Sequence, residues 1–378
     1  MTQSKIRPIA FYLPQYHPIP ENDEWWGKGF TEWTNVTKAK PLFKGHEQPK
    51  LPGELGFYDL RVAEVREHQA ALAREYGIEG FMYWHYWFAG KRILERPFQE
   101  VLKSGKPDFP FCLGWANETW SGIWHGMPDR ILMEQTYPGL DDYESHFYAI
   151  LPAFQDSRYI VVEGKPLFFV YRPFNIPDCS LFIETWRRLA EKNGLNGIYF
   201  IGFSGTPDNE YSKLLELGFD GVYSQRIGEA KRSIDKKFLN RLKRKLGYKS
   251  IQKEYTSKGV YTYEDMIKNF TKPNDAKSNM YPMLMPNWDN SPRSGRNSMI
   301  LKNSTPEVFR KHLNTVLEVV KEKPKEHRII FIKSWNEWAE GNYLEPDINY
   351  GRKYLEVLKE ELDNFNQALQ ENSMRVNQ

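Results

Sequence analysis

The sequence predicts a closed (β/α)8 barrel, in which eight parallel strands form a central ring and helices cover its outside. Short apolar, β-rich runs alternate with helical patterns along the whole chain. Several of these runs are apolar on both faces, as strands buried in a parallel sheet are. The 378 residues suit one decorated barrel as well as two smaller domains. The unbroken alternation favours the single barrel.

Eight apolar runs are the candidate strands of the ring. They are Pro8–Leu13, Gly80–Tyr86, Pro110–Trp115, Leu167–Tyr171, Gly197–Phe203, Gly221–Tyr223, Pro282–Met285 and Arg328–Lys333. A doubly wound open sheet is the weaker alternative, because no glycine-rich phosphate turn follows the first run.

Helical patterns fill the intervals between these strands. The candidate helices are Leu60–Tyr76, Pro97–Lys103, Asp142–Ala153, Leu181–Asn193, Glu210–Leu217, Pro306–Lys321 and Arg352–Asn364. Asp142 stands where an N-cap is expected, and Gly77, Gly194 and Gly218 stand where helices are expected to end.

Two segments break the alternation. Residues 14–58 form a long stretch rich in Pro, Gly and Trp, expected as a loop, and residues 226–279 form a basic, helix-prone insertion. Both follow strands, so both should rise on the C-terminal face of the barrel, where active sites of such barrels lie. We therefore expect residues 1–378 to form one catalytic domain with two large decorations.

The formal charge of +3 conceals a local imbalance. The segment 231–249 holds nine Lys or Arg and one acid, Asp235, and the rest of the chain is mildly acidic. A solvated helix face is the simpler interpretation, and docking on an anionic membrane surface is the functional alternative. The balanced total and the lack of a recognisable module argue against a nucleic-acid partner.

Targeting and cofactor signals are missing from the sequence. The first residues lack an apolar signal region, and no run is long enough to span a membrane. Two isolated cysteines, Cys112 and Cys179, suit a reducing compartment. We expect a cytoplasmic protein, peripheral to the inner membrane if the basic segment docks there. The usual phosphate-loop and zinc motifs are absent, so neither a cofactor nor a metal is expected.

Polar and aromatic residues follow almost every predicted strand, and seven of the 12 Trp fall in these segments. Sugars offer apolar faces to indole rings and hydroxyl groups to polar side chains, so the segments favour a sugar-binding mouth over plain core filling. The expected substrate-binding residues are Gln15, Tyr16, His17, Tyr83, His85, Trp87, Trp115, Asn117, Glu118, Trp120, Tyr171, Arg172, Trp288, Asp289, Trp335 and Asn336, with Glu32 and Trp33 from the first long segment.

Glu337 and Glu340 are the candidate catalytic residues. They stand three positions apart just beyond the last predicted strand, and Trp335 and Trp338 lie near them in the sequence. Two close carboxyls shift each other's pKa, so one can hold a proton while the other is ionised. Such pairs carry out the hydrolysis of glycosidic bonds. The alternative is an exposed helical turn, where acids favour the helix dipole.

Six stretches of the chain resemble the WbsX-type proteins, a bacterial branch similar to glycoside hydrolase family 99. They are Ala10-Phe-Tyr-Leu-Pro-Gln-Tyr-His17, Trp26-Gly-Lys-Gly-Phe-Thr-Glu-Trp33, Gly80-Phe-Met-Tyr-Trp-His-Tyr-Trp-Phe88, Trp115-Ala-Asn-Glu-Thr-Trp120, Trp288-Asp-Asn-Ser-Pro-Arg293 and Trp335-Asn-Glu-Trp-Ala-Glu-Gly341. The resemblance implies a (β/α)8 barrel, carbohydrate chemistry, and a place in O-antigen or capsule gene clusters.

In the related endo-α-mannosidases, a Trp-Asn-Glu-Trp-His-Glu run carries both catalytic carboxyls. By resemblance, Glu337 takes the proton of the sugar 2-hydroxyl, which attacks C1 to give a 1,2-anhydro sugar. Glu340 is then the general acid and, in the second step, the general base. This chain has Ala339 where that family has His.

Three functions remain open at this stage. The first is a retaining, endo-acting glycosidase on a bacterial oligosaccharide or polysaccharide. The second is a glycosyltransferase of lipopolysaccharide O-antigen or capsule biosynthesis, although the chain has no Asp-x-Asp motif and no phosphate loop. The third is a non-catalytic glycan-binding protein, against which the presence of both Glu337 and Glu340 argues.

Overall fold

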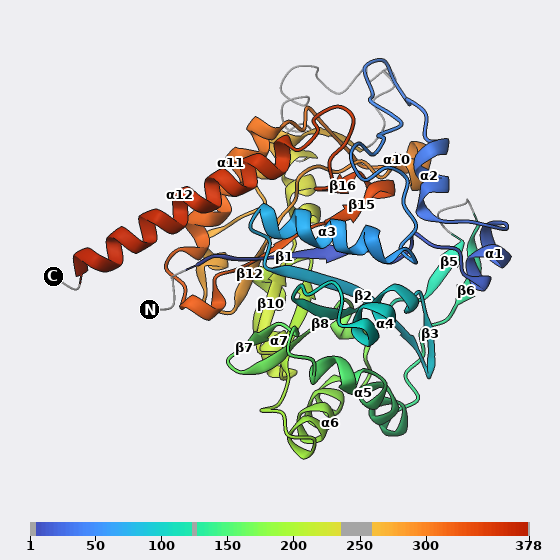
Figure 1. The fold of residues 1–378 in the computed structure, drawn as a ribbon, viewed down its shortest axis with the longest axis vertical. Helices are drawn as coiled ribbons and strands as arrows, with labels where there is room; N and C mark the ends of the chain where they lie inside the picture. The colour runs from blue at the N-terminus through green and yellow to red at the C-terminus, as the bar shows by residue number, and fades with distance from the viewer. Residues whose placement is uncertain (1–4, 123–126, 236–258, 377–378) are drawn as a thin grey trace, which may run out of the picture.

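A computed structural model describes residues 5–122, 127–235 and 259–376 and contains the predicted barrel (Figure 1). Its eight strands are β1 (Arg7–Tyr12), β2 (Gly80–Phe88), β4 (Phe111–Trp115), β8 (Lys165–Val170), β9 (Tyr199–Ser204), β10 (Gly221–Ser224), β12 (Met280–Leu284) and β14 (Ile329–Ile332). Neighbouring strands pair in parallel, and β1 pairs with both β2 and β14, which closes the ring. The predicted fold class is confirmed, and every predicted strand overlaps an observed one.

Helices cover the outside of the ring as predicted. They are α3 (Ala63–Glu75), α4 (Arg96–Ser104), α5 (Leu140–Phe154), α6 (Cys179–Lys192), α7 (Pro207–Glu216), α11 (Pro306–Val320) and α12 (Lys353–Val376). Gly77, Gly194 and Gly218 take positive φ after their helices, as expected. The N-cap prediction was wrong, because α5 begins at Leu140 and Asp142 instead accepts a hydrogen bond from Trp87.

The first long segment contains two short helices where we expected only loop. They are α1 (Pro20–Trp26) and α2 (Glu32–Lys38). Proline at the first position of α1 and a capping box at Thr31 and Thr34 explain their starts. Neither helix has the length that makes a periodic pattern stand out from its surroundings.

The basic insertion is only partly described. It opens with helical residues 227–235 and ends with β11 (Val260–Thr262), α9 (Tyr263–Ile267) and the 3-10 turn η3 (Pro273–Ala276). Most of the basic segment 231–249 lies outside the described residues. β11 pairs in parallel with β13 (Ile300–Lys302), which joins the insertion to the chain after β12.

Smaller elements decorate the ends of the barrel. They are β3 (Lys91–Ile93), β5 (Trp120–Gly122), β6 (Met127–Met133), β7 (Val161–Val162), η2 (Pro173–Asn175), α10 (Ser291–Ser294), η4 (Gly295–Asn297), η5 (Lys325–His327), β15 (Asn336–Glu337), η6 (Trp338–Glu340) and β16 (Asn342–Tyr343). No described helix is both long and apolar enough to cross a membrane.

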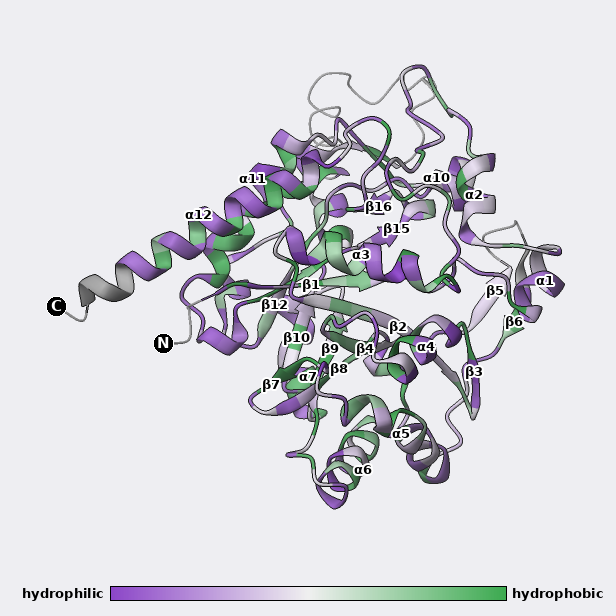
Figure 2. Cartoon of the chain, viewed as in Figure 1, coloured by the Kyte–Doolittle hydropathy of each residue, from purple (hydrophilic) through white to green (hydrophobic). Residues whose placement is uncertain are grey.

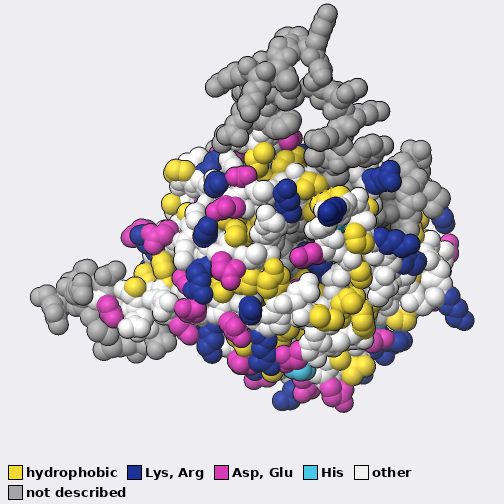
Figure 3. Space-filling view, turned by 90° about the horizontal axis from the view of Figure 1, so that it is seen from above, with side chains coloured by type: hydrophobic (Ala, Val, Ile, Leu, Met, Phe, Trp, Pro, Cys, Tyr) yellow, Lys and Arg dark blue, Asp and Glu magenta, His cyan; other side chains and the backbone are white. Residues whose placement is uncertain are grey.

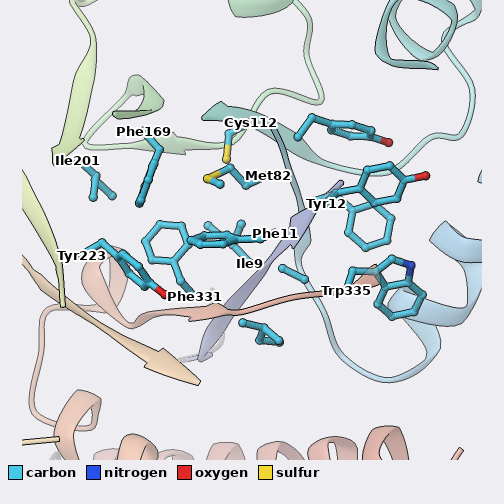
Figure 4. Packing of buried hydrophobic residues seen from close by; sticks show 14 of the residues in the cluster. Ile9, Phe11, Tyr12, Met82, Cys112, Phe169, Ile201, Tyr223, Phe331 and Trp335 are labelled. Atoms are coloured by element: carbon cyan, nitrogen blue, oxygen red, sulfur yellow. The ribbon is translucent and has the colours of Figure 1, made fainter. Parts of the chain in front are cut away.

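Aromatic side chains fill the inside of the ring (Figure 4). The ring of Phe11 lies 5.2–5.6 Å, between centroids, from those of Trp84, Tyr223, Phe169 and Phe331, which come from four other strands. Tyr12 points the opposite way and packs on the β2 side chains outside the ring. Successive residues of a strand therefore face opposite sides, and this alternation decides which strand-end residues reach the mouth.

Hydropathy follows the same arrangement. The central strands are mostly apolar, and α12 alternates apolar and polar stripes along its length (Figure 2). On the face seen in Figure 3, basic, acidic and apolar side chains are interspersed over the described surface.

Candidate active site

The two candidate carboxyls lie in a tight turn immediately beyond the last barrel strand. Glu337 ends β15 and Glu340 ends η6, and β15 pairs with β16 in antiparallel fashion. Gly341 closes the turn with φ of 62°, and a Cβ there would lie 2.7 Å from the backbone nitrogen of Asp289. Only glycine fits this close approach without strain. The turn thereby folds both glutamates back over the C-terminal mouth of the barrel.

Arg293 on α10 joins three carboxylates from two distant parts of the chain. Its Nη1 lies 2.7 Å from Glu340 Oε1 and 3.5 Å from Glu337 Oε1, and its Nη2 lies 3.1 Å from Glu32 Oε2 on α2. All four side chains are at most 12% exposed. The planar guanidinium has five N–H donors in a fixed fork, so it can bond several carboxylates at once.

Lys333 supplies a second cation on the other side of the pair. Its Nζ lies 3.8 Å from Glu337 Oε2 and 3.9 Å from Glu340 Oε2, and 5.0 Å from the centre of the Trp288 ring. The Ser334 hydroxyl donates to Glu337 Oε2 at 3.1 Å. The pair is therefore enclosed by positive charge and hydrogen-bond donors.

The surroundings shift the pKa values of the two carboxyls in opposite directions. Burial raises the pKa of Glu340, and the charge of Glu337 raises it further. Burial also opposes ionisation of Glu337, but the charges of Lys333 and Arg293 outweigh it and lower the pKa of Glu337. Burial raises the pKa of Glu32 despite its bond to Arg293. Glu337 is thus the group that ionises first, and Glu340 is the group that keeps a proton longer.

Several predicted binding residues support this turn from below. Asn336 accepts from the Leu13 backbone nitrogen at 2.8 Å and donates to the Leu13 carbonyl at 3.1 Å, which fixes the turn to the end of β1. Tyr16 donates its hydroxyl hydrogen to the Asn336 carbonyl and accepts from the Trp338 backbone. The rings of Trp33 and Trp335 pack beside Tyr16 and Phe81 respectively. The structure brings these residues to the site as its supports.

Three predicted residues on β2 are not brought together with the carboxyls. Side chains alternate between the two faces of β2. The side chains of Tyr83, His85 and Trp87 point outward, and those of the residues between them point toward the inside of the barrel. His85 Nε2 lies 2.8 Å from His146 Nε2, and Trp87 stacks on the same imidazole. Burial lowers the pKa of both histidines, so neutral rings explain the contact. The inward neighbours of these residues are Trp84 and Tyr86.

The residues after β4 and β8 form a second group at the rim. Trp115 is buried in the outer core, where its indole donates to the Trp87 carbonyl. Asn117 bonds the Arg172 backbone in both directions, and Arg172 Nη2 pairs with Glu118 at 2.8 Å. The Arg172 guanidinium lies 4.3 Å from the centre of the Tyr171 ring. Glu118, Tyr171 and Arg172 are the members of this group that keep exposed surface.

The remaining predicted residues hold the first segment in place. Gln15 donates to Asn22 at 3.4 Å, and His17 Nδ1 lies 2.9 Å from the Pro14 carbonyl oxygen. Trp120 packs against Trp25 of α1 and against Tyr86.

Asp289 links the first long segment to the turn that carries Glu337 and Glu340. Its carboxylate accepts from His46 at 2.8 Å and from Gln48 at 2.7 Å, while its backbone nitrogen donates to the Glu340 carbonyl. Burial would raise the pKa of Asp289, but the hydrogen bond from His46 and the charge of Lys50, with further donors, lower it to about 2. The carboxylate of Asp289 is therefore ionised and bonded within the protein to His46 and Gln48.

Sequence reasoning missed Arg293, Lys333, Tyr86 and Glu345. Arg293 and Lys333 stand at the ends of recognisable stretches, but a single basic residue there carries no signal of its own. Tyr86 lies close enough for the charges of Glu337 and the other site groups to affect its pKa, which burial raises most. Glu345 is 2% exposed and accepts from Tyr58, Gln69 and Trp338. Within the described ranges, no His, Cys, Asp or Glu residues gather as a metal site.

Comparison with known families agrees with this architecture. The model of the family described as Glycosyltransferase WbsX matches residues 8–358. Two proteins of Xanthomonas campestris, both called uncharacterized protein WxcX, are 37% and 36% identical to the chain over 366 residues. The match takes in 94% of this chain and 49% of each relative, so the chain spans about half the length of these relatives.

Solved structures share the fold at low sequence identity. The glycoside hydrolase family 99 endo-α-mannosidase of Bacteroides thetaiotaomicron has a TM-score of 0.57 and 16% identity, over 96% of this chain and 98% of that one. A structure described as a glycoside hydrolase-like protein has a TM-score of 0.59 and 14% identity, over 95% and 94% of the two chains.

Proposed function

The chain belongs to the WbsX glycosyltransferase family, and from that premise we propose that it is a glycan-active enzyme that cleaves glycosidic bonds with retention of configuration. One observation carries the proposal. Glu337 and Glu340 share a buried site with two cations, and their pKa values are pushed in opposite directions. Such a separation provides one proton acceptor and one proton donor at the same pH.

The charge count of the site supports these roles. Glu32, Glu337 and Glu340 face Arg293 and Lys333, so three carboxyls share two cations. The site becomes neutral when one carboxyl takes a proton, which is the cheapest state for buried groups. Glu340, whose pKa is raised by burial and by Glu337, is the carboxyl that we assign to hold it.

The proposed first step uses both glutamates at once. Ionised Glu337 takes the proton of the sugar 2-hydroxyl as that oxygen attacks C1, and Glu340 gives its proton to the departing glycosidic oxygen. The product is a 1,2-anhydro sugar. In the second step Glu340 takes a proton from water, the water oxygen attacks C1, and Glu337 returns its proton to O2. Two inversions at C1 give net retention.

Binding of the glycan is proposed at the rim residues that keep exposed surface. Tyr171 and Trp288 offer ring faces, and Arg172 and Glu118 offer polar groups at the same mouth. Tyr86 lies within electrostatic reach of the carboxyls and joins this set. We propose a bacterial oligosaccharide or polysaccharide as the substrate, with endo-cleavage suggested by the family 99 resemblance.

A glycosyltransferase of O-antigen or capsule assembly is the second candidate, since the family name favours it. Glycosyl transfer needs a base for the acceptor hydroxyl, a role that the ionised carboxyl of the pair fits, so the pair alone does not decide between the two reactions. The cytoplasmic location stays a prediction. The membrane contact of the basic segment also stays a prediction, because residues 236–249 of that segment lie outside the described structure.

The test is a panel of bacterial O-antigen and capsular oligosaccharides incubated with the protein in water enriched in oxygen-18. Hydrolysis releases shorter products that carry one heavy oxygen at the new reducing end. Transfer between glycans gives longer products without the label, and would show that a sugar hydroxyl replaces water in the second step. Turnover of nucleotide-sugar donors, with every oligosaccharide left intact, would overturn the glycosidase proposal.

A further inference from the structure

A third buried acid lies behind the catalytic turn. Glu345 follows β16 and is 2% exposed. Its Oε2 accepts from the Trp338 indole at 2.6 Å and from the Tyr58 hydroxyl at 2.8 Å, and its Oε1 accepts from Gln69 at 2.6 Å. Three donors thus satisfy this buried carboxyl, as buried polar groups require.

These donors lead to both neighbours of Glu337. Trp338 follows Glu337 directly, and its indole is bonded to Glu345 itself. Asn336 precedes Glu337 and donates to the Tyr58 hydroxyl at 3.4 Å, which in turn donates to Glu345. The backbone nitrogen of Glu345 donates to the Trp335 carbonyl at 3.2 Å. Glu345 therefore contacts, directly or through Tyr58, residues on both sides of Glu337.

The bonds to Glu345 differ in kind from those at Glu337 and Glu340. Trp338, Gln69 and Tyr58 are all neutral donors, whereas Arg293 and Lys333 are cations. Burial raises the pKa of Glu345 to about 7, although the hydrogen bonds from Trp338, Gln69 and Tyr58 act to lower it. The carboxyl thus keeps its hydrogen bonds without drawing on the cations of the active site.

We propose that Glu345 is a positioning residue for the proposed catalytic pair, which fixes Trp338 and Asn336 so that Glu337 stays between Lys333 and Arg293. The inference rests on the proposed function for its effect on turnover. Its structural part concerns only the placement of Glu337, and can be measured without a substrate.

Two substitutions separate the position of the carboxyl from its charge. In Glu345→Gln, the amide oxygen still accepts from Trp338 and Tyr58. Its NH2 then faces Gln69, whose amide can turn over because its other partner is the Tyr12 hydroxyl, which both donates and accepts. Glu345→Leu removes every side-chain acceptor at similar volume. Trp338→Phe removes the bond between Trp338 and Glu345, together with part of the ring that stacks on Tyr343.

Asp347 is the matched control. It is a buried carboxyl two residues further along the same loop, with bonds to the Tyr343 hydroxyl at 2.9 Å and the Tyr350 backbone at 2.6 Å. Neither partner belongs to the turn from Trp335 to Glu340. The Tyr343 ring stacks on Trp338 at 3.8 Å between centroids, and Asp347→Ala keeps that ring while it removes the bond at the Tyr343 hydroxyl. Asp347→Ala therefore reports what loss of a buried loop carboxyl does in general.

The experiment measures kcat and KM together with the titration of glutamate side-chain carboxyls by carbon-13 NMR, with the signals of the pair assigned from Glu337→Gln and Glu340→Gln. We expect Glu345→Leu to lower kcat about tenfold or more with a smaller change in KM, and to bring the pKa values of Glu337 and Glu340 closer together. Glu345→Gln should keep most of the activity and the separation, and Asp347→Ala should resemble the wild type. If Glu345→Leu does not fold, Trp338→Phe carries the same comparison with a smaller change.

Two results would overturn the inference. One is a folded Glu345→Leu variant in which both kcat and the difference between the pKa values of Glu337 and Glu340 are unchanged. If the leucine variant does not fold, the same result in Trp338→Phe counts. The other is an equal loss in Asp347→Ala. A different result would separate the two proposals: if Glu337→Gln and Glu340→Gln both keep full turnover while Glu345→Leu still narrows the separation, the positioning inference stands and the proposed function fails.

Discussion

Arg293 donates from Nη1 to Glu340 Oε1 at 2.7 Å, although the two residues come from different loops of the barrel mouth. The same guanidinium also reaches Glu337 and Glu32. A single side chain thereby holds α2, α10 and the turn of Glu337 and Glu340 around one centre of charge. The arrangement makes the stability of the mouth and the acidity of the pair depend on the same residue.

Arg293→Met should both destabilise the protein and abolish turnover. The change removes the cation that pairs with Glu32 and one of the two cations beside Glu337 and Glu340, and breaking such buried pairs costs about 3–5 kcal/mol of unfolding free energy. Denaturant unfolding and the rate on a glycan substrate are the measurements. Arg296→Met, on an exposed neighbour, is the control. Equal stability of the two variants would refute the central role of Arg293.

Lys333→Met should move the pH–rate profile toward higher pH. The proposed mechanism requires Glu337 ionised and Glu340 protonated, so the rate should fall at low pH when Glu337 takes a proton and at high pH when Glu340 loses one. The charge of Lys333 lowers the pKa of both carboxyls, so its removal raises both. The measurement is kcat/KM against pH, with exposed Lys302→Met as the control. A profile that stays in place would show that Lys333 does not set the acidity of the pair.

Asp289→Asn should remove an acid-sensitive part of the stability. The folded pKa of Asp289 is about 2, below its unfolded value, so the ionised tie stabilises the fold above about pH 4 and this contribution disappears as pH falls through about 2. The shift corresponds to about 2 kcal/mol. Unfolding free energies between pH 2 and 5 should show a shallower slope in Asp289→Asn than in the wild type. The same slope in both, with exposed Asp141→Asn as reference, would contradict the assignment.

The two faces of β2 should respond differently to substitution. Tyr86 lies within reach of the charges of the active site, whereas Trp87 stacks on His146 of α5 outside the ring. Tyr86→Phe should therefore lower kcat/KM with little change in stability. Trp87→Phe should mainly lower stability, since it removes the bond to Asp142 and part of the stack. Thermal unfolding and steady-state rates distinguish the two variants. Lost stability in Tyr86→Phe with lost kcat/KM in Trp87→Phe would contradict the assignment of the Tyr86 face of β2 to the mouth.

The fold was predictable because its evidence is repetitive. Eight buried strands with helices between them leave a pattern that survives errors of one or two residues at each boundary. The helices α1 and α2 were missed because they are seven residues each, too short for periodicity to distinguish them from loop. The start of α5 was misplaced because an acidic residue in a first turn resembles an N-cap.

The candidate site was predictable in its location but not in its geometry. The spacing of Glu337 and Glu340 marked them, and the structure places Glu32 with them around Arg293. Position at a strand end could not tell which residues of β2 face inward. Trp84 and Tyr86 do, and Tyr83, His85 and Trp87 do not, because the inward face depends on how the strand is registered in the barrel. Arg293 and Glu345 acquire their meaning only from long-range contacts with residues far away in the sequence.

The most direct test of the account compares Glu337→Gln and Glu340→Gln with the wild type on one cleavable glycan. Glutamine keeps the size of each side chain but removes its proton transfer, so both variants should bind the glycan by calorimetry with near-normal affinity and lose turnover by at least about a hundredfold. Turnover at the wild-type rate in both variants would contradict the assignment of Glu337 and Glu340 as the catalytic pair.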